Sequence, residues 1–211
     1  MNMLSKLLAI ALSVSALTFA SAASAQEAPD ALVKRISDDV LNTAKTDKDI
    51  QAGNISRIVS LVEEKILPYV DSERMTSLAA GRYWRQATPE QQKQLITEFR
   101  SLLIYTYSGA LSQVRDQKIE YKPLRADPAD TEVEVRSQVI QSRGEPIQLS
   151  YRLEKLANGW KLYDVNVMGA WLVEAYKGTF QSEITKGGID GLIKSLSDKN
   201  KQLASRSSAK K

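Results

Sequence analysis

Apolar residues change their spacing twice along this chain, near residue 116 and again near residue 169. Before the first point and after the second they recur every three or four positions, which is the period of an amphipathic helix. Between the two points they alternate with polar residues, as in a strand with one buried face. A single block of strands flanked by helices predicts an α+β fold, in which an antiparallel sheet offers its apolar face to helices.

The first helical part is predicted to cover residues 30–115. Thr88-Pro89-Glu90-Gln91 indicates the start of its longest helix, because Thr is a good N-cap, Pro suits the first helical position and Gln completes a capping box. This helix reaches about Val114, and its apolar stripe is wider than a single contact face needs, so we expect it to be the central helix. Three shorter amphipathic helices are predicted before it, at 30–44, 55–66 and 72–80.

The sheet is predicted to cover residues 117–167 with about four strands. Asn158-Gly159 is a hairpin dipeptide between the third and fourth of them. Helical spacing returns over 170–203, with a break at Gly187-Gly188, and we expect a disordered basic tail at 204–211. The strands are marked by Ile119, Tyr121 and Leu124, by Val133, Val135 and Val139, by Ile147, Leu149, Tyr151 and Leu153, and by Trp160–Val167.

Residues 1–25 have the order of a cleavable secretory signal peptide. Lys6 is followed by an apolar run and then by small residues ending in Ala23-Ser24-Ala25. The run is shorter than the ~20 residues of a membrane span, and no cysteine is present to carry a lipid anchor. We therefore expect a soluble, exported protein with one domain over residues 26–203.

The chain contains neither cysteine nor histidine. This composition removes disulfides, thiol chemistry, the usual general base and the commonest metal ligand. The sequence also lacks a nucleophile elbow and a phosphate-binding glycine loop, and it shows no basic stripe interleaved with aromatic residues that would predict nucleic-acid binding. We therefore expect that the protein is not an enzyme, has no metal site and has no nucleic-acid partner.

Asp164 is the one acidic residue that invites a second interpretation. The alternation predicts that it lies on the strand face opposite Tyr163, Val165 and Val167, where it would cap or hydrogen-bond a neighbouring element. The alternative is an enzyme with a cone-shaped fold that uses Asp164 as its base. A third reading is an adaptor or chaperone that binds protein in an apolar groove.

Several segments together resemble the MlaC family of periplasmic phospholipid-binding proteins, also called the toluene-tolerance auxiliary family of ABC transporters. They occur in the family's order and cover most of the chain after residue 25. The sequence departs from the family pattern after Gly169, where Ala170-Trp171 replaces a usual Ser two positions on. The matching segments are Ile66–Val70, Gly81–Pro89, Phe99-Arg100, Tyr107–Leu111, Gly159–Val165 and Lys186–Leu192.

The resemblance implies a cone of the nuclear-transport-factor type with an N-terminal helical annex, enclosing a deep apolar cavity. It also implies a shuttle that carries phospholipid across the periplasm and maintains outer-membrane lipid asymmetry. The partners would be an outer-membrane lipoprotein complex and an inner-membrane ABC transporter with an MCE-domain protein. Phospholipid would be the cargo, and no cofactor is expected.

Exposed acyl chains would be costly, because each CH₂ moved from hydrocarbon to water costs roughly 0.8 kcal/mol. An enclosed pocket between the long helix and the apolar sheet face is therefore expected. The residues predicted to line it are Phe99, Leu103, Tyr107, Val135, Leu149, Tyr151, Val165, Val167 and Trp171.

Overall fold

The computed structural model describes residues 26–208, so the predicted signal peptide and residues 209–211 lie outside the described part of the chain. None of the described helices is long and apolar enough to cross a membrane. The elements are α1 (Pro29–Thr46), α2 (Lys48–Gln51), α3 (Ile55–Lys65), η1 (Leu67–Tyr69), α4 (Ser72–Ala80), η2 (Gly81–Gln86), α5 (Pro89–Ser112), β1 (Lys118–Tyr121), β2 (Glu132–Ile140), β3 (Ile147–Leu156), β4 (Gly159–Val167), β5 (Ala170–Trp171) and α6 (Leu172–Ser208).

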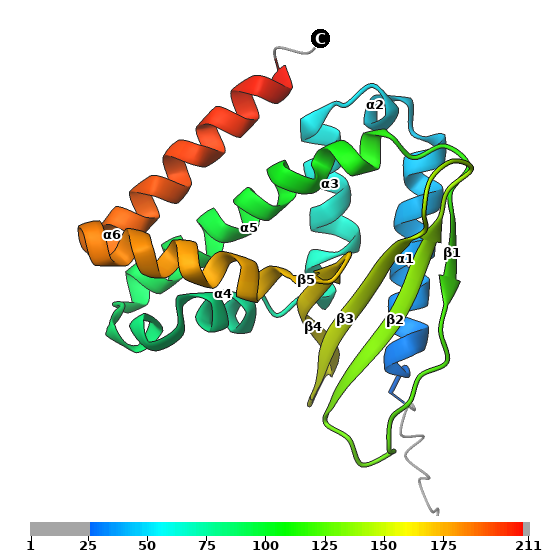
Figure 1. Cartoon of the computed structure of the whole chain (residues 1–211), viewed down its shortest axis with the longest axis horizontal. Coiled ribbons are helices and arrows are strands. Elements are labelled where there is room, and N and C mark those ends of the chain that lie inside the picture. The colour runs from blue at the N-terminus through cyan, green and yellow to red at the C-terminus, as the bar shows by residue number, and fades with distance from the viewer. Residues whose placement is uncertain (1–25, 209–211) are drawn as a thin grey trace, which may run out of the picture.

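The five strands form one antiparallel sheet in the order β1-β2-β3-β4-β5, which confirms the predicted α+β fold. The hairpin between β3 and β4 lies where it was predicted, and Gly159 begins β4 with a φ of 126° that suits glycine. Figure 1 shows α1 running along the sheet behind β1 and β2. Leu32 and Val33 of α1 pack there against Val135, Leu153 and Trp160.

Helix α5 is the central helix of the other half, as predicted. Thr88 and Gln91 form the capping box at its start, and Phe99 in its middle is fully buried. The Phe99 ring makes edge contacts with Tyr176 and Phe180 of α6, with ring centroids 5.1 and 4.9 Å apart. Helices α4, α5 and α6 thus share one apolar core.

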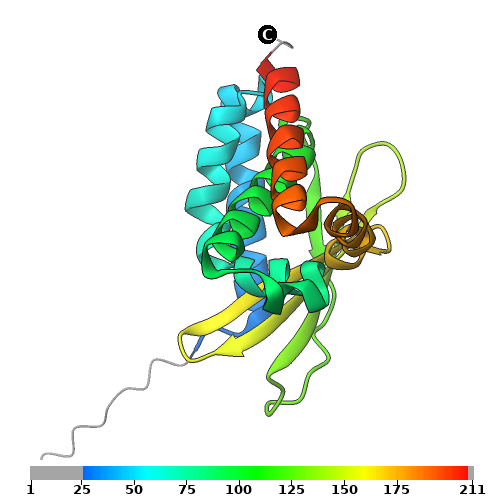
Figure 2. The same ribbon diagram turned by 90° about the vertical axis from the view of Figure 1, so that its left-hand side faces the viewer.

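Helix α6 turns back on itself at Gly188, whose φ of 69° interrupts the helix at the predicted double glycine. Figure 2 shows the second half of α6 (red) lying over α5 (green). Three hydrogen bonds join these helices: Gln91 Nε2 donates to Asp190 Oδ1 (2.7 Å), and Asn200 Nδ2 donates to the Glu98 backbone carbonyl (2.9 Å) and to Glu98 Oε2 (2.7 Å). The break at Gly188 therefore returns the chain to the core.

Several boundaries differ from the sequence prediction; Leu124, for example, was expected in the first strand but lies beyond the end of β1 at Tyr121. The tail expected at 204–211 is helical as far as Ser208, because Leu203 packs against the core of α4, α5 and α6 and the helix continues past it. Trp171, expected in a helix, belongs to the two-residue strand β5 that pairs with Asn166 and Val167. The sheet therefore has a fifth strand directly before α6.

A bulge in β4 changes which side chains face the helices. The register with β3 shifts between Arg152 and Leu153, so Tyr163 is an extra residue in the strand. The Tyr163 hydroxyl donates to Glu132 at 3.0 Å, and the guanidinium of Arg74 lies 3.8 Å from the centre of its ring. Simple alternation, which grouped Tyr163 with Val165 and Val167, was wrong at this residue.

Asp164 makes the structural contact that the sequence predicted for it. Its side chain is 2% exposed, and Oδ1 accepts a hydrogen bond from the backbone N–H of Val173, the second residue of α6, at 3.1 Å. The other carboxylate oxygen lies 3.6 Å from Nη1 of Arg152. Asp164 thus satisfies one of the free N–H groups at the start of α6 and joins that helix to β3 and β4.

Asp164→Asn is expected to change how stability depends on pH. Burial raises the pKa of Asp164 above its ordinary 3.8, although backbone N–H groups and Arg152 oppose the rise. The folded protein therefore binds this proton at a higher pH than the unfolded chain, and the wild type gains stability as the pH falls towards 3.8. Urea unfolding at neutral and mildly acidic pH should show that gain relative to the variant. A difference between the two proteins that stays constant with pH would contradict the assignment.

Candidate functional site

A cavity of about 610 Å³ lies between the sheet and the helices. Its walls come from α1, α3, α4, α5 and β1 to β4, so residues far apart in the sequence meet there. Aliphatic side chains make up most of the lining, and the volume falls in the range of ~300–1,000 Å³ that is usual for small-molecule sites. The fold thus contains an apolar cavity that its own side chains do not fill.

Seven of the nine residues predicted to line a pocket are brought together on this cavity. Helix α5 contributes three of them, and β3 and β4 contribute two each. Lipid contact by these residues stays a prediction, because the structure gives their position and not their ligand. The seven are Phe99, Leu103, Tyr107, Leu149, Tyr151, Val165 and Val167.

The other two, Val135 and Trp171, lie elsewhere. Val135 is 1% exposed and packs beneath Leu32 and Val33 of α1, so helix atoms fill the space next to it. Trp171 is on the edge strand β5, where the guanidinium of Arg152 lies 3.7 Å from the centre of its ring. Strand alternation made Val135 plausible, but α1 covers it. Trp171 was expected in a helix, and the short strand β5 holds it away from the cavity.

The sequence prediction missed the walls made by α1 and α3. Ile36 and Val40 of α1 and Ile58 and Val62 of α3 also line the cavity. Their helical spacing was visible in the sequence, but an amphipathic face has the same pattern whether it packs against solid core or borders a cavity. Only the three-dimensional arrangement separates the two cases.

The cavity opens beside the second half of α5. Tyr107, Ala110 and Gln113 line the cavity and are also exposed, and they succeed one another at helical spacing. Tyr107 is 40% exposed, and burial of the rest of its side chain raises the pKa of its hydroxyl above 10.0. This edge of α5 therefore offers neutral groups to a ligand that enters from solvent.

Apart from Arg100, the polar side chains that the described residues place on the cavity wall are uncharged. The Tyr151 hydroxyl lies 3.3 Å from Ser137 Oγ, and burial raises the pKa of Tyr151 above 10.0, so the hydroxyl stays protonated. Asp164, the residue considered as an enzyme's base, is absent from the cavity wall and is engaged by Val173 and Arg152. Among the described residues, no three acidic side chains converge in a way that could hold a metal ion. The arrangement suits the enclosure of an apolar ligand.

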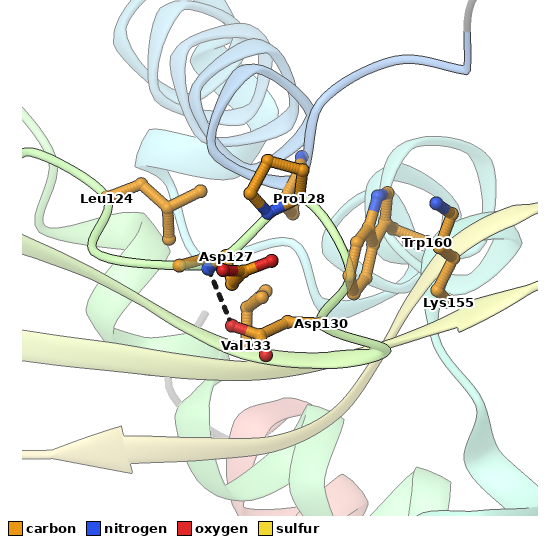
Figure 3. Close-up of a pocket in the computed structure, with 9 residues that line it drawn as sticks. Leu124, Asp127, Pro128, Asp130, Val133, Lys155 and Trp160 are labelled. Carbon is orange, nitrogen blue, oxygen red and sulfur yellow. Dashed lines mark hydrogen bonds between the residues drawn. The ribbon is translucent and has the colours of Figure 1, made fainter.

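A second, smaller pocket of about 240 Å³ lies where the chain between β1 and β2 passes the start of α1 (Figure 3). Its two acidic side chains, Asp127 and Asp130, already accept hydrogen bonds from backbone N–H groups of their own turn. The Asp127 N–H donates to Asp130 Oδ2 at 2.8 Å, and the Ala129 N–H donates to Asp127 Oδ1 at 2.9 Å. The large apolar cavity is therefore the candidate site.

Comparisons with known proteins agree with this geometry. The family model described as MlaC protein matches residues 34–198. The intermembrane phospholipid transport system binding protein MlaC of Haemophilus influenzae is 25% identical over 172 residues, 80% of each chain. The toluene tolerance protein ttg2D of Pseudomonas putida is 26% identical over 167 residues, 79% of this chain and 77% of its own.

A solved structure is similar over most of its length. It is the phospholipid-binding protein from Ralstonia solanacearum in complex with a phospholipid, and it is 52% identical to this chain. The match covers 83% of this chain and 98% of the other, with a TM-score of 0.80. The fold that surrounds the cavity is thus one that a phospholipid-bound protein also adopts.

Proposed function

The chain belongs to the MlaC family, and we propose from this that it is a phospholipid-binding transport protein that holds the acyl chains of its cargo in the 610 Å³ cavity. The single observation that carries the proposal is that an apolar cavity opens to solvent along one helix edge. Acyl chains gain roughly 0.8 kcal/mol for each CH₂ that leaves water. An opening beside Tyr107 lets a polar head group stay hydrated while the chains are enclosed.

We further propose that the protein works in the periplasm and shuttles phospholipid between the outer and inner membranes. The signal-like order of residues 1–25 supports export, and the Haemophilus influenzae relative is described as part of an intermembrane system. The partners inferred from the sequence resemblance are an outer-membrane lipoprotein complex and an inner-membrane ABC transporter with an MCE-domain protein. A carrier between two such complexes would maintain outer-membrane lipid asymmetry.

The proposal predicts that the protein moves phospholipid through water. Protein purified from the periplasm without detergent is mixed with donor vesicles that contain a fluorescent phospholipid and a quencher, and with unlabelled acceptor vesicles. The rate of dequenching should rise in proportion to protein concentration, because each carrier removes a lipid that would otherwise leave the bilayer slowly. A rate that equals the spontaneous one at every protein concentration would contradict transport.

A further inference from the structure

Arg100 is the one charged residue on the wall of the large cavity within the described part of the chain. It lies on α5, in the helical stripe that also carries Leu103, Ile104 and Tyr107 to the cavity. Arg100 is partly buried, and the lining residues next to it on α5, Phe99, Leu103 and Ile104, are aromatic or apolar. A cation in such surroundings loses part of its hydration.

No carboxylate among the described residues compensates for that loss. Among the described residues, the guanidinium of Arg100 takes part in none of the ion pairs or side-chain hydrogen bonds. Two other partly exposed arginines are paired: Arg74 with Glu132 and Glu154, and Arg152 with Asp164. The five N–H donors of Arg100 are therefore available to a ligand inside the cavity.

The position of Arg100 suits the polar end of a lipid. It lies two helical turns from Tyr107, which is about 10 Å along the helix axis, and its partial exposure lets a bound group remain in contact with water. A planar guanidinium binds phosphate through two parallel hydrogen bonds, which a neutral side chain cannot match. An anion bound here would pair with the one charged side chain that the described residues place on the cavity wall.

We propose that Arg100 binds the phosphate group of the phospholipid, an inference that rests on the proposed function. Phosphate is the part that all glycerophospholipids share, and it lies next to the glycerol that carries the acyl chains. Recognition at Arg100 would select phospholipids as a class against neutral diacylglycerol. It would not separate one head group from another, because choline, glycerol and ethanolamine lie beyond the phosphate.

The test compares lipids with the same acyl chains and different polar ends. The wild type and Arg100→Gln are stripped of lipid and offered dioleoylphosphatidylcholine, dioleoylphosphatidylglycerol or dioleoylglycerol, and bound lipid is measured by native mass spectrometry. Arg100→Gln is expected to bind both phospholipids about tenfold more weakly, with no change for dioleoylglycerol. Arg100→Lys, which keeps the charge and loses the planar fork, should fall between the two proteins.

Arg85→Gln is the matched control, because it removes the same charge from an exposed position outside the cavity. It should bind all three lipids as the wild type does. Retained binding of dioleoylglycerol by Arg100→Gln also shows that this variant is folded. Inorganic phosphate in excess should leave bound phospholipid in place, because it brings no acyl chains.

Three results would overturn the inference. The first is equal loss of phospholipid and diacylglycerol in Arg100→Gln, the second is no loss of either, and the third is tight binding of inorganic phosphate alone that depends on Arg100. A wild type that takes up neither class of lipid would instead contradict the proposed function itself. The failure of the phosphate site and the failure of the carrier role are thus separate outcomes.

Discussion

Ile104→Glu is expected to leave the protein folded and to weaken phospholipid binding by at least about 100-fold. Ile104 lines the large cavity from α5, and it belongs to none of the three clusters of buried core residues. A carboxylate at this position would have to lose water when acyl chains enter, and because it lies one helical turn from Arg100 it would also compete with an anionic ligand for that guanidinium. That cost falls on the lipid-bound state, so binding suffers more than folding.

Leu156→Glu provides the matched control for Ile104→Glu. Leu156 is 37% exposed at the end of β3 and lies outside the cavity, so the substitution adds the same charge without meeting a ligand. Bound lipid is measured by extraction of both variants after purification without detergent. Wild-type lipid content in Ile104→Glu, or equal loss in both variants, would show that the cavity is not where the chains reside.

Phe99→Ala is expected to lower the free energy of unfolding by about 3–5 kcal/mol. Phe99 is 0% exposed, and its ring contacts Tyr176 and Phe180 in edge geometry. Such aromatic pairs contribute about 0.5–1.5 kcal/mol beyond the area that they bury. Loss of this ring would leave a void at the junction of α5 with α6.

Urea denaturation of lipid-free protein measures the effect of Phe99→Ala, because a ligand bound to the folded state would add to its stability and mask the loss. Tyr105→Ala, on the same helix, removes an aromatic ring that is partly exposed and outside the buried core cluster. Its cost should be clearly smaller. Equal costs for Phe99→Ala and Tyr105→Ala would contradict the central role given to Phe99.

Local sequence signals predicted the elements well where one residue decides the local geometry. The capping box at Thr88 and Gln91 begins α5 as expected, and Gly188 breaks α6 at the predicted double glycine. Both signals act through backbone geometry and hydrogen bonds within a few residues. The bulge at Tyr163 gave no such signal, because it depends on the register between two strands.

The cavity was harder to predict than the fold. An apolar side chain borders a cavity only when no other element packs against it, and that depends on the tertiary structure. Val135 and Val165 both alternate correctly on sheet strands, yet α1 covers the first while the second borders open space. Arg100 lies within a segment that resembles the family, but only the packing shows that no carboxylate among the described residues pairs with it. Sequence periodicity identifies an apolar face and leaves open what occupies the space in front of it.

The central claim is that the cavity carries phospholipid. Its most direct test uses wild-type protein purified from the periplasm without detergent. The protein is examined by native mass spectrometry, and the bound material is then extracted with solvent and identified. The account predicts phospholipid bound to the protein as purified, and renewed uptake after the lipid is removed. Repeated recovery of bare protein that also refuses added phospholipid would contradict it.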